Sequence, residues 1–226
     1  MIRRPDQRVA VFIDTQNMYH SAKHLFGGRV NFGAVVDAAV GERHLIRAIA
    51  YVAKSKTGEE QAFFDALLQS GIELKIKDVQ EFASGQKKAD WDVGMTIDAI
   101  GISPRVDVVI LVTGDGDFVP LVEYLHSHGV MCEVVAFGES TNAKLREVCD
   151  AFLDVSEDPK TFLIHAHGAT KKHVPGKADE EDHDLAHLLD EDLTMDKRVA
   201  KSIKPPPIHP PKPMHDGGGR KIRVTF

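Results

Sequence analysis

The chain has 226 residues, of which 42% are hydrophobic and 27% are charged, and its net charge is −6. This length predicts one folded domain with a sizeable core. The acidic balance excludes a basic coat over the whole protein but leaves room for a local basic patch. Two cysteines, Cys132 and Cys149, are too few for a disulfide framework or a Cys-based zinc site. Because no apolar run reaches the ~18–20 residues of a membrane helix, we expect a cytoplasmic protein with no membrane partner.

Strand-like and helix-like patterns alternate along residues 1–157. Strands are expected at 9–13, 44–52, 72–77, 106–112 and 130–137, and helices at 15–26, 31–40, 58–70, 91–101, 117–128 and 141–150. The strictly alternating run 72–77 is typical of an edge or half-buried strand. Gly71 and Gly129 stand where two of the helices should end. This alternation predicts an α/β fold with a mostly parallel sheet covered by helices on both faces.

Residues 158–226 differ from the rest of the chain in composition. The segment 178–196 holds nine acidic residues and no Lys or Arg, and the Pro- and Gly-rich segment 197–226 holds eight Lys and Arg against one Asp. Such segments cannot bury enough apolar surface to offset their ordering entropy, so we expect a largely disordered tail after a domain at 1–157. The basic end of this tail suggests a tether to RNA, to the ribosome or to another anionic partner.

Acidic residues follow two of the predicted strands directly. Asp14 ends the first strand, with Asn17 about one helical turn later, and Asp115 and Asp117 follow the 106–112 strand. In an open parallel sheet, ligands bind beyond the carboxyl ends of the strands. Each Asp could instead cap a helix or form a turn. Independent caps have no reason to gather at one sheet edge, however, so we expect a common site.

A third acidic group stands at the predicted helix 91–101. Asp92 and Asp98 are six positions apart and therefore lie about 240° apart around the helix axis, so they cannot both face one metal ion. We predict Asp92 as the ligand and Asp98 as a supporting or packing residue. Asp90 precedes the helix and could either turn towards the site or cap the helix.

This set of acids predicts a particular chemistry. Clustered carboxylates repel one another unless a cation neutralises them. Oxygen ligands without a Cys or His pattern suit Mg²⁺ or Mn²⁺. Such an ion lowers the pKa of an attacking water and stabilises negative charge on phosphate oxygens, which is what hydrolysis of a phosphodiester requires.

Three motifs together resemble the NYN domain of the LabA-like branch, a relative of the PIN-domain nucleases. They are Phe12-Ile-Asp-x-x-Asn17, Lys88-Ala-Asp-Trp-Asp-Val followed by Asp98, and Thr113-Gly-Asp-Gly-Asp-Phe118, where Thr113 replaces the usual serine and keeps a hydroxyl. The resemblance covers residues 8–156 and implies a PIN-like, Rossmann-type three-layer α/β/α sandwich with a ribonuclease site. It implies that the metal ligands are Asp14, Asp92, Asp115 and Asp117. It further implies that Asp115 binds directly, Asp117 through water, and Asn17 as a polar positioning residue.

Several residues near these motifs could contact a substrate. Lys87 and Lys88 precede the acidic helix, and we predict that they bind the RNA backbone. Lys75 and Lys77 fit an RNA-binding rim and a solvated face equally well. Trp91 could stack on a base, although packing at the start of the helix is the favoured interpretation.

We therefore predict a metal-dependent ribonuclease. Tyr19 and His20, which follow Asn17 closely, could line a substrate path. A non-catalytic RNA- or protein-binding regulator on the same fold is the alternative, which RNA affinity independent of EDTA would favour. A haloacid-dehalogenase-like phosphohydrolase fits poorly, because such an enzyme needs a second aspartate two residues after its first, where this chain has Gln16.

Overall fold

The computed structural model describes residues 3–54, 60–78, 80–81, 87–88 and 91–164. All of them belong to one compact unit, which spans Met1–Leu193, whereas a second unit, Thr194–Phe226, lies outside the described residues. The predictions for the acidic and basic segments of the tail also fall outside the described residues.

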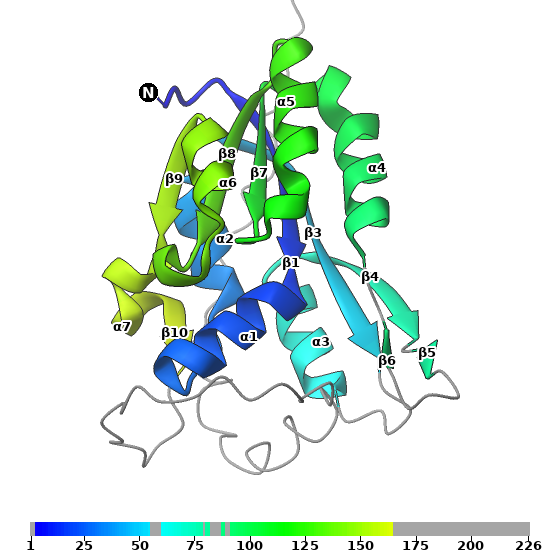
Figure 1. The fold of residues 1–226 in the computed structure, drawn as a ribbon, viewed down its shortest axis with the longest axis vertical. Helices are drawn as coiled ribbons and strands as arrows, with labels where there is room; N and C mark the ends of the chain where they lie inside the picture. Colours follow the sequence, from blue (N-terminus) through cyan, green and yellow to red (C-terminus); the bar gives the residue numbers. More distant parts are fainter. Residues whose placement is uncertain (1–2, 55–59, 79, 82–86, 89–90, 165–226) are drawn as a thin grey trace, which may run out of the picture. The chain divides into compact units, whose positions relative to one another are not determined.

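Six parallel strands form the central sheet (Figure 1). They are β1 (Arg8–Asp14), β3 (His44–Lys54), β4 (Glu73–Asp78), β7 (Val108–Val112), β8 (Met131–Ala136) and β9 (Ala151–Asp154). Their order is β4-β3-β1-β7-β8-β9, and every neighbouring pair is parallel. From β1 the chain first adds β3 and β4 on one side and later β7, β8 and β9 on the other, as in Rossmann-type sheets. The boundary between β1 and β7 is the topological switch point, and ligands bind there beyond the carboxyl ends of the strands.

Helices cover both faces of this sheet. They are α1 (Thr15–Phe26), α2 (Phe32–Val40), α3 (Gln61–Gln69), α4 (Asp92–Ile102), α5 (Val119–Ser127), α6 (Ala143–Val148) and α7 (Pro159–Phe162). In Figure 1, α4, α5 and α6 lie in front of the sheet and α2 lies behind it. The predicted layered α/β architecture is thereby confirmed. Within the part of the chain that the structure describes, no helix has the length and apolarity needed to cross a membrane.

Short elements complete the connections. Two antiparallel pairs join β2 (Arg29–Val30) to β10 (Leu163–Ile164), and β5 (Gln80–Glu81) to β6 (Lys87–Lys88). Four 3₁₀ turns are η1 (Ser103–Arg105), η2 (Gly116–Phe118), η3 (Gly138–Ser140) and η4 (Val155–Glu157). The turn η2 follows β7 and carries part of the site described below.

The two central strands owe their position to continuous apolar sequence. Residues 9–13 in β1 and 108–112 in β7 have no exposed surface. Strands covered on both faces lack the alternation of a half-exposed sheet, and this explains why both runs are uniformly apolar. Gly71 and Gly129, after α3 and α5, have φ of 74°, the left-handed conformation expected of glycine at a helix end.

The carboxyl-terminal part of the described chain differs from the sequence prediction. The helix predicted at 141–150 ends at Val148, and the following residues form β9, a strand that was not predicted. Four residues are too few to display a period of two, so β9 is defined by its pairing with β8 rather than by its own sequence. Beyond residue 157, α7 contacts α2 and β10 pairs with β2.

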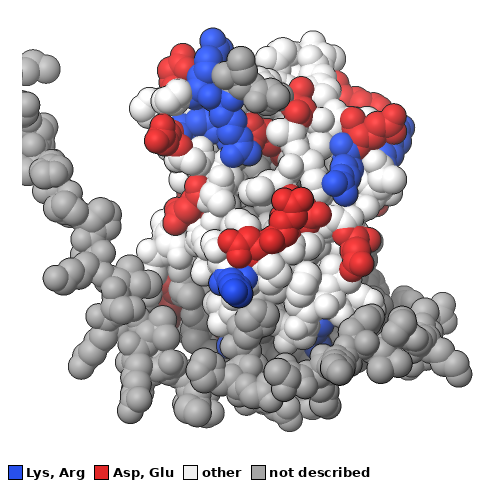
Figure 2. Space-filling view, turned by 90° about the vertical axis from the view of Figure 1, so that its left-hand side faces the viewer, with Lys and Arg blue, Asp and Glu red and all other residues white. Residues whose placement is uncertain are grey.

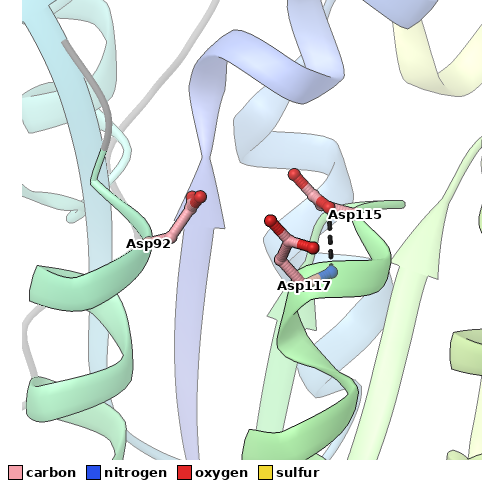
Figure 3. A group of neighbouring side chains, drawn as sticks. All are labelled: Asp92, Asp115 and Asp117. Carbon is pink, nitrogen blue, oxygen red and sulfur yellow. Dashed lines mark hydrogen bonds between the residues drawn. The ribbon is translucent and has the colours of Figure 1, made fainter.

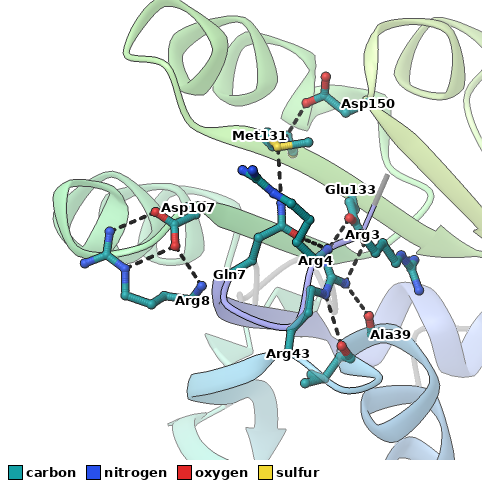
Figure 4. Close-up of polar contacts among 12 residues, drawn as sticks. Arg3, Arg4, Gln7, Arg8, Ala39, Arg43, Asp107, Met131, Glu133 and Asp150 are labelled. Carbon is teal, nitrogen blue, oxygen red and sulfur yellow. Dashed lines mark hydrogen bonds and ion pairs between the residues drawn. The ribbon is translucent and has the colours of Figure 1, made fainter. Parts of the chain in front are cut away.

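A buried ion pair and an exposed one lie near the amino ends of the strands, away from the switch point (Figure 4). The Arg43 guanidinium binds both carboxylate oxygens of Glu133 in β8 at 2.7 and 3.0 Å, and both side chains are only 2% exposed. Arg3 also donates to Glu133, at 3.0 Å. At the start of β1, Arg8 pairs with Asp107, and these hydrogen bonds lower the pKa of Asp107 to about 2. These contacts connect the strands near their amino ends, whereas the acidic motifs lie at the carboxyl ends.

Candidate metal centre

Three aspartates meet at the carboxyl edge of the sheet (Figure 3). One carboxylate oxygen each from Asp92, Asp115 and Asp117 lies within 4.8 Å of the other two. Asp92 is the first residue of α4 and points from that helix towards the other two, which come from the turn after β7. Asp92 and Asp115 are partly buried and Asp117 is exposed, so solvent reaches the group.

The turn after β7 is held by side-chain hydrogen bonds. Asp115 Oδ1 accepts from the backbone N–H of Asp117 at 2.9 Å, the bond drawn in Figure 3. The Asp115 N–H itself donates to Oγ1 of the buried Thr113 at 3.2 Å. Asn17 Oδ1 accepts from the N–H of Gly114 at 2.9 Å. Together these bonds fix the backbone on which Asp115 and Asp117 stand.

Asp14 lies beside this group rather than within it. Its carboxylate caps α1 by accepting from the N–H of Asn17 at 3.1 Å, and it also accepts from Thr113 Oγ1 at 3.4 Å. Burial, opposed in part by these hydrogen bonds, raises the pKa of Asp14, and the negative charge of Asp115 raises it further. Asp14 is thus both a helix cap and an electrostatic neighbour of the cluster, although its oxygens are not among the three within 4.8 Å.

Asp98 is not part of the three-aspartate group and is bound by residues of β3 and β4. It accepts hydrogen bonds from the Tyr51 hydroxyl at 2.6 Å and from Lys75 Nζ at 2.5 Å. Burial raises the pKa of Asp98, but the hydrogen bonds from Lys75 and Tyr51 outweigh it, so the net shift is downwards. Lys75 is thereby paired with an acid on α4, a contact that neither interpretation from the sequence included.

Trp91 packs at the start of α4, the arrangement favoured from the sequence. Its Nε1–H donates to the carbonyl oxygen of Val52 at 3.0 Å, and its ring lies edge-to-face against Tyr51 with centroids 5.4 Å apart. Lys77 Nζ lies 5.4 Å from the centroid of the Trp91 ring. These contacts fix the residue before Asp92, at the point where α4 begins.

Two predictions about this region fall on residues that the structure does not describe in full. The backbones of Lys87 and Lys88 form β6, but the positions of their side chains lie outside the description. Asp90 is not among the described residues. Their predicted roles therefore stay predictions.

The parallel α/β sheet with aspartates gathered at its switch point fits the PIN-like class of nuclease folds. The chain belongs to one family of this class, the NYN domain family, whose sequence profile matches residues 8–157. The resemblance found in the three acidic motifs is thereby confirmed.

Two relatives share most of this domain. The chain is 28% identical over 171 residues to the low amplitude and bright protein LabA of Synechococcus elongatus, covering 72% of this chain and 90% of LabA. It is 31% identical to a protein of unknown function from Vibrio parahaemolyticus whose crystal structure superimposes with a TM-score of 0.65, covering 73% of this chain and 100% of that one.

Proposed function

We propose that this chain hydrolyses phosphodiester bonds of RNA at a Mg²⁺ or Mn²⁺ ion held by Asp92, Asp115 and Asp117, with Asp14 as a fourth carboxylate. The observation that carries this proposal is the approach of three carboxylate oxygens to within 4.8 Å at the carboxyl edge of the sheet. Membership of a PIN-like nuclease family supports the choice of a phosphodiester substrate.

The donor set fits a hard divalent cation. Three negative charges at this separation repel one another, and a bound cation offsets this repulsion because it attracts all three. The group contains only carboxylates, the ligands that Mg²⁺ and Mn²⁺ prefer, and no Cys or His that would favour zinc. When bound, such an ion supplies an activated water and stabilises charge on the phosphate oxygens.

The chain itself contributes preorganisation. The Asp117 N–H orients Asp115 through its hydrogen bond, and Asn17 holds the preceding residue, Gly114. On the opposite side, the packing of Trp91 fixes the start of α4 and therefore Asp92. Because these supports come from α1, from η2 and from the contact of Trp91 with β3, the carboxylates are placed before a ligand arrives, which lowers the cost of binding it.

We expect RNA to contact few basic side chains of this domain. On the face seen in Figure 2, Lys and Arg side chains occur in separate groups interspersed with acidic ones. Each phosphate contact adds to the salt dependence of binding, so a domain with few contacts should lose affinity only gently as salt rises. Lys87 and Lys88, close to Asp92 in sequence, are the residues that we propose for these contacts, and the basic tail supplies further ones.

The test uses the full chain and labelled single-stranded RNA with Mg²⁺, Mn²⁺ or EDTA. We expect cleavage with either metal ion and none with EDTA. Asp92→Asn and Asp115→Asn should abolish it, whereas Asp37→Asn, an exposed aspartate on α2, should leave it unchanged. Absence of cleavage together with absence of Mn²⁺ binding by calorimetry would refute the proposal.

The non-catalytic alternative gives a different pattern in the same experiment. RNA would bind without being cut, and its affinity would be the same with EDTA and in the Asp115→Asn variant. That result would identify an RNA-binding module on a nuclease fold.

A further inference from the structure

An apolar cavity opens at the carboxyl edge of the sheet, beside the start of α1 and the end of β3. It has a volume of about 200 Å³, and its walls come from the start of α1, the end of β3, the helix α3 and the pair β2–β10. Tyr19 and Phe63 contribute aromatic rings to its lining, Arg29 and Gln16 contribute polar groups, and Glu60 contributes a buried carboxyl group. We propose that this cavity binds one nucleobase of single-stranded RNA, next to the phosphate held at the aspartates. This inference rests on the ribonuclease function proposed above.

Residues that line the cavity are sequence or hydrogen-bond neighbours of residues next to two of the proposed metal ligands, Asp14 and Asp92. Thr15 and Gln16, which line the cavity, follow Asp14 directly. On the other side, Val52 lines the cavity and its carbonyl oxygen accepts from Trp91, the residue before Asp92. The cavity and the aspartates therefore both lie at the carboxyl edge of the sheet, where a single RNA strand crossing that edge could meet both.

The size of the cavity suits a single ring system. Sites for drug-sized ligands usually enclose about 300–1,000 Å³, so a volume of about 200 Å³ points to a smaller flat group. Of the three parts of a nucleotide, only the base has an apolar face. The phosphate and the ribose would have to give up their hydration in such a cavity without enough polar partners.

The lining offers the contacts by which proteins bind unpaired bases. Tyr19 and Phe63 are partly exposed, so their rings are accessible from the cavity. Bases of single-stranded RNA are typically splayed out and stacked on such rings. The half-buried Arg29 adds a planar guanidinium that can donate to a base oxygen or stack on the ring, and the Gln16 amide can both donate and accept.

Binding of uncharged nucleosides tests the cavity without metal and without catalysis. The full chain, in EDTA, is titrated with adenosine, guanosine, cytidine and uridine while the ring resonances of Tyr19 and Phe63 are followed by NMR, and with ribose as the base-free probe. We expect saturable shifts at these rings with at least one nucleoside and none with ribose.

Two substitutions on α3 make the matched comparison. Ala66 is exposed and lines the cavity, so Ala66→Trp should fill it and weaken nucleoside binding at least tenfold. Gln69→Trp adds the same ring to an exposed position of the same helix outside the cavity lining and should leave the affinity unchanged. Circular dichroism of both variants verifies that each is folded.

Each remaining outcome overturns the base-binding proposal. Absence of nucleoside shifts at the rings, or equal binding by Ala66→Trp and wild type, shows that the cavity does not hold a base. Nuclear Overhauser contacts from the Tyr19 or Phe63 ring to residues beyond Ile164, without nucleoside binding, show that the chain's own tail occupies it. Failure of the ribonuclease proposal is distinct, because it appears as nucleoside binding without metal-dependent cleavage.

Discussion

The side-chain oxygen of Asn17 accepts a hydrogen bond from the backbone N–H of Gly114 at 2.9 Å. This bond connects the first turn of α1 to the turn after β7, across the switch point of the sheet. The backbone N–H of Asn17 also donates to Asp14, so one residue links the cap of α1 to the turn that carries Asp115. We therefore propose that Asn17 positions the carboxylates and does not contact the substrate.

Replacement of Asn17 should weaken metal binding through this turn. In Asn17→Ala, the Gly114 N–H loses its acceptor, which costs about 1–3 kcal/mol when the group is shielded from water, and the turn before Asp115 gains freedom. We expect Mn²⁺ affinity to fall about 10-fold, the lower end of the range for residues that support metal ligands, measured by titration calorimetry.

Asn31→Ala is the matched control for this effect. Asn31 caps α2 by accepting from the Ala34 N–H at 3.2 Å, so its loss removes a similar bond without a link to the turn after β7. It should destabilise the fold by about 1 kcal/mol and leave Mn²⁺ affinity intact. Equal Mn²⁺ affinity in both variants would contradict the positioning role of Asn17.

Asp14→Asn should not destabilise the protein at pH 7. Burial raises the pKa of Asp14 above the unfolded value of 3.8, so folding favours its protonated form. Its charge therefore lowers stability as pH rises from about 3.8 through the raised folded pKa, and the penalty persists at neutral pH. An amide at position 14 removes that charge and keeps an oxygen to cap α1.

Urea unfolding as a function of pH checks this expectation. The free energy of unfolding of Asp14→Asn should equal or exceed that of the wild type at pH 7, and the two curves should converge below pH 3.8. A loss of stability at pH 7 would mean that the ionised carboxylate contributes favourably to the fold, contrary to its raised pKa.

Part of the site could be predicted from the sequence, because Asp14 and Asp115 follow two strands that are recognisable from their apolar residues. Asp14 comes directly after a fully apolar run and Asp115 comes three residues after the end of another, and the two runs form adjacent buried strands. The approach of Asp92 depends on the crossing from β4 to α4 and on the contact between α4 and η2, which no local pattern encodes. Helix geometry favoured Asp92 over Asp98, and the NYN motifs indicated the same residue.

Contacts between distant segments account for what the sequence did not show. Helix geometry predicted that Asp98 faces away from Asp92, but its partners Tyr51 and Lys75 come from β3 and β4. The cavity likewise combines residues from α1, β2, β3 and α3, and no pattern within any one of these segments predicts it. Such features arise only when packing brings the elements together.

The pair of hydrogen bonds to Asp98 should stabilise α4 against β3 and β4. Asp98→Asn replaces a charged acceptor, and we expect a loss of about 1–2 kcal/mol at pH 7. The pKa of Asp98 is lowered from 3.8 by folding, so this contribution is full above pH 3.8 and is lost as pH falls through the lowered value. The stability difference from the wild type should be equal at pH 7 and pH 5 and smaller near pH 3.

Asp78→Asn, on the exposed end of β4, serves as the control for charge alone. Chemical unfolding at the three pH values gives the comparison. If the Asp98→Asn difference were the same at pH 3 as at pH 7, ionisation of Asp98 would not be the source of its contribution.

Among the ion pairs near the amino ends of the strands, the buried pair of Arg43 and Glu133 should contribute most to the free energy of unfolding. Glu133→Ala leaves the Arg43 guanidinium buried without a counter-charge, and such a loss costs about 3–5 kcal/mol. Glu73→Ala breaks the exposed pair with Arg47, whose partners are 44% and 49% exposed, and should cost less than about 1 kcal/mol. Urea unfolding at pH 7 measures both changes.

A double substitution separates the value of the pair from the cost of breaking it. Arg43→Met combined with Glu133→Leu removes both buried charges, so most of the stability lost in Glu133→Ala should return. Because this pair lies near the amino ends of the strands, the folded double variant should bind Mn²⁺ like the wild type. A Glu133→Ala cost no larger than that of Glu73→Ala would show instead that water or a rearranged Arg43 relieves the buried charge.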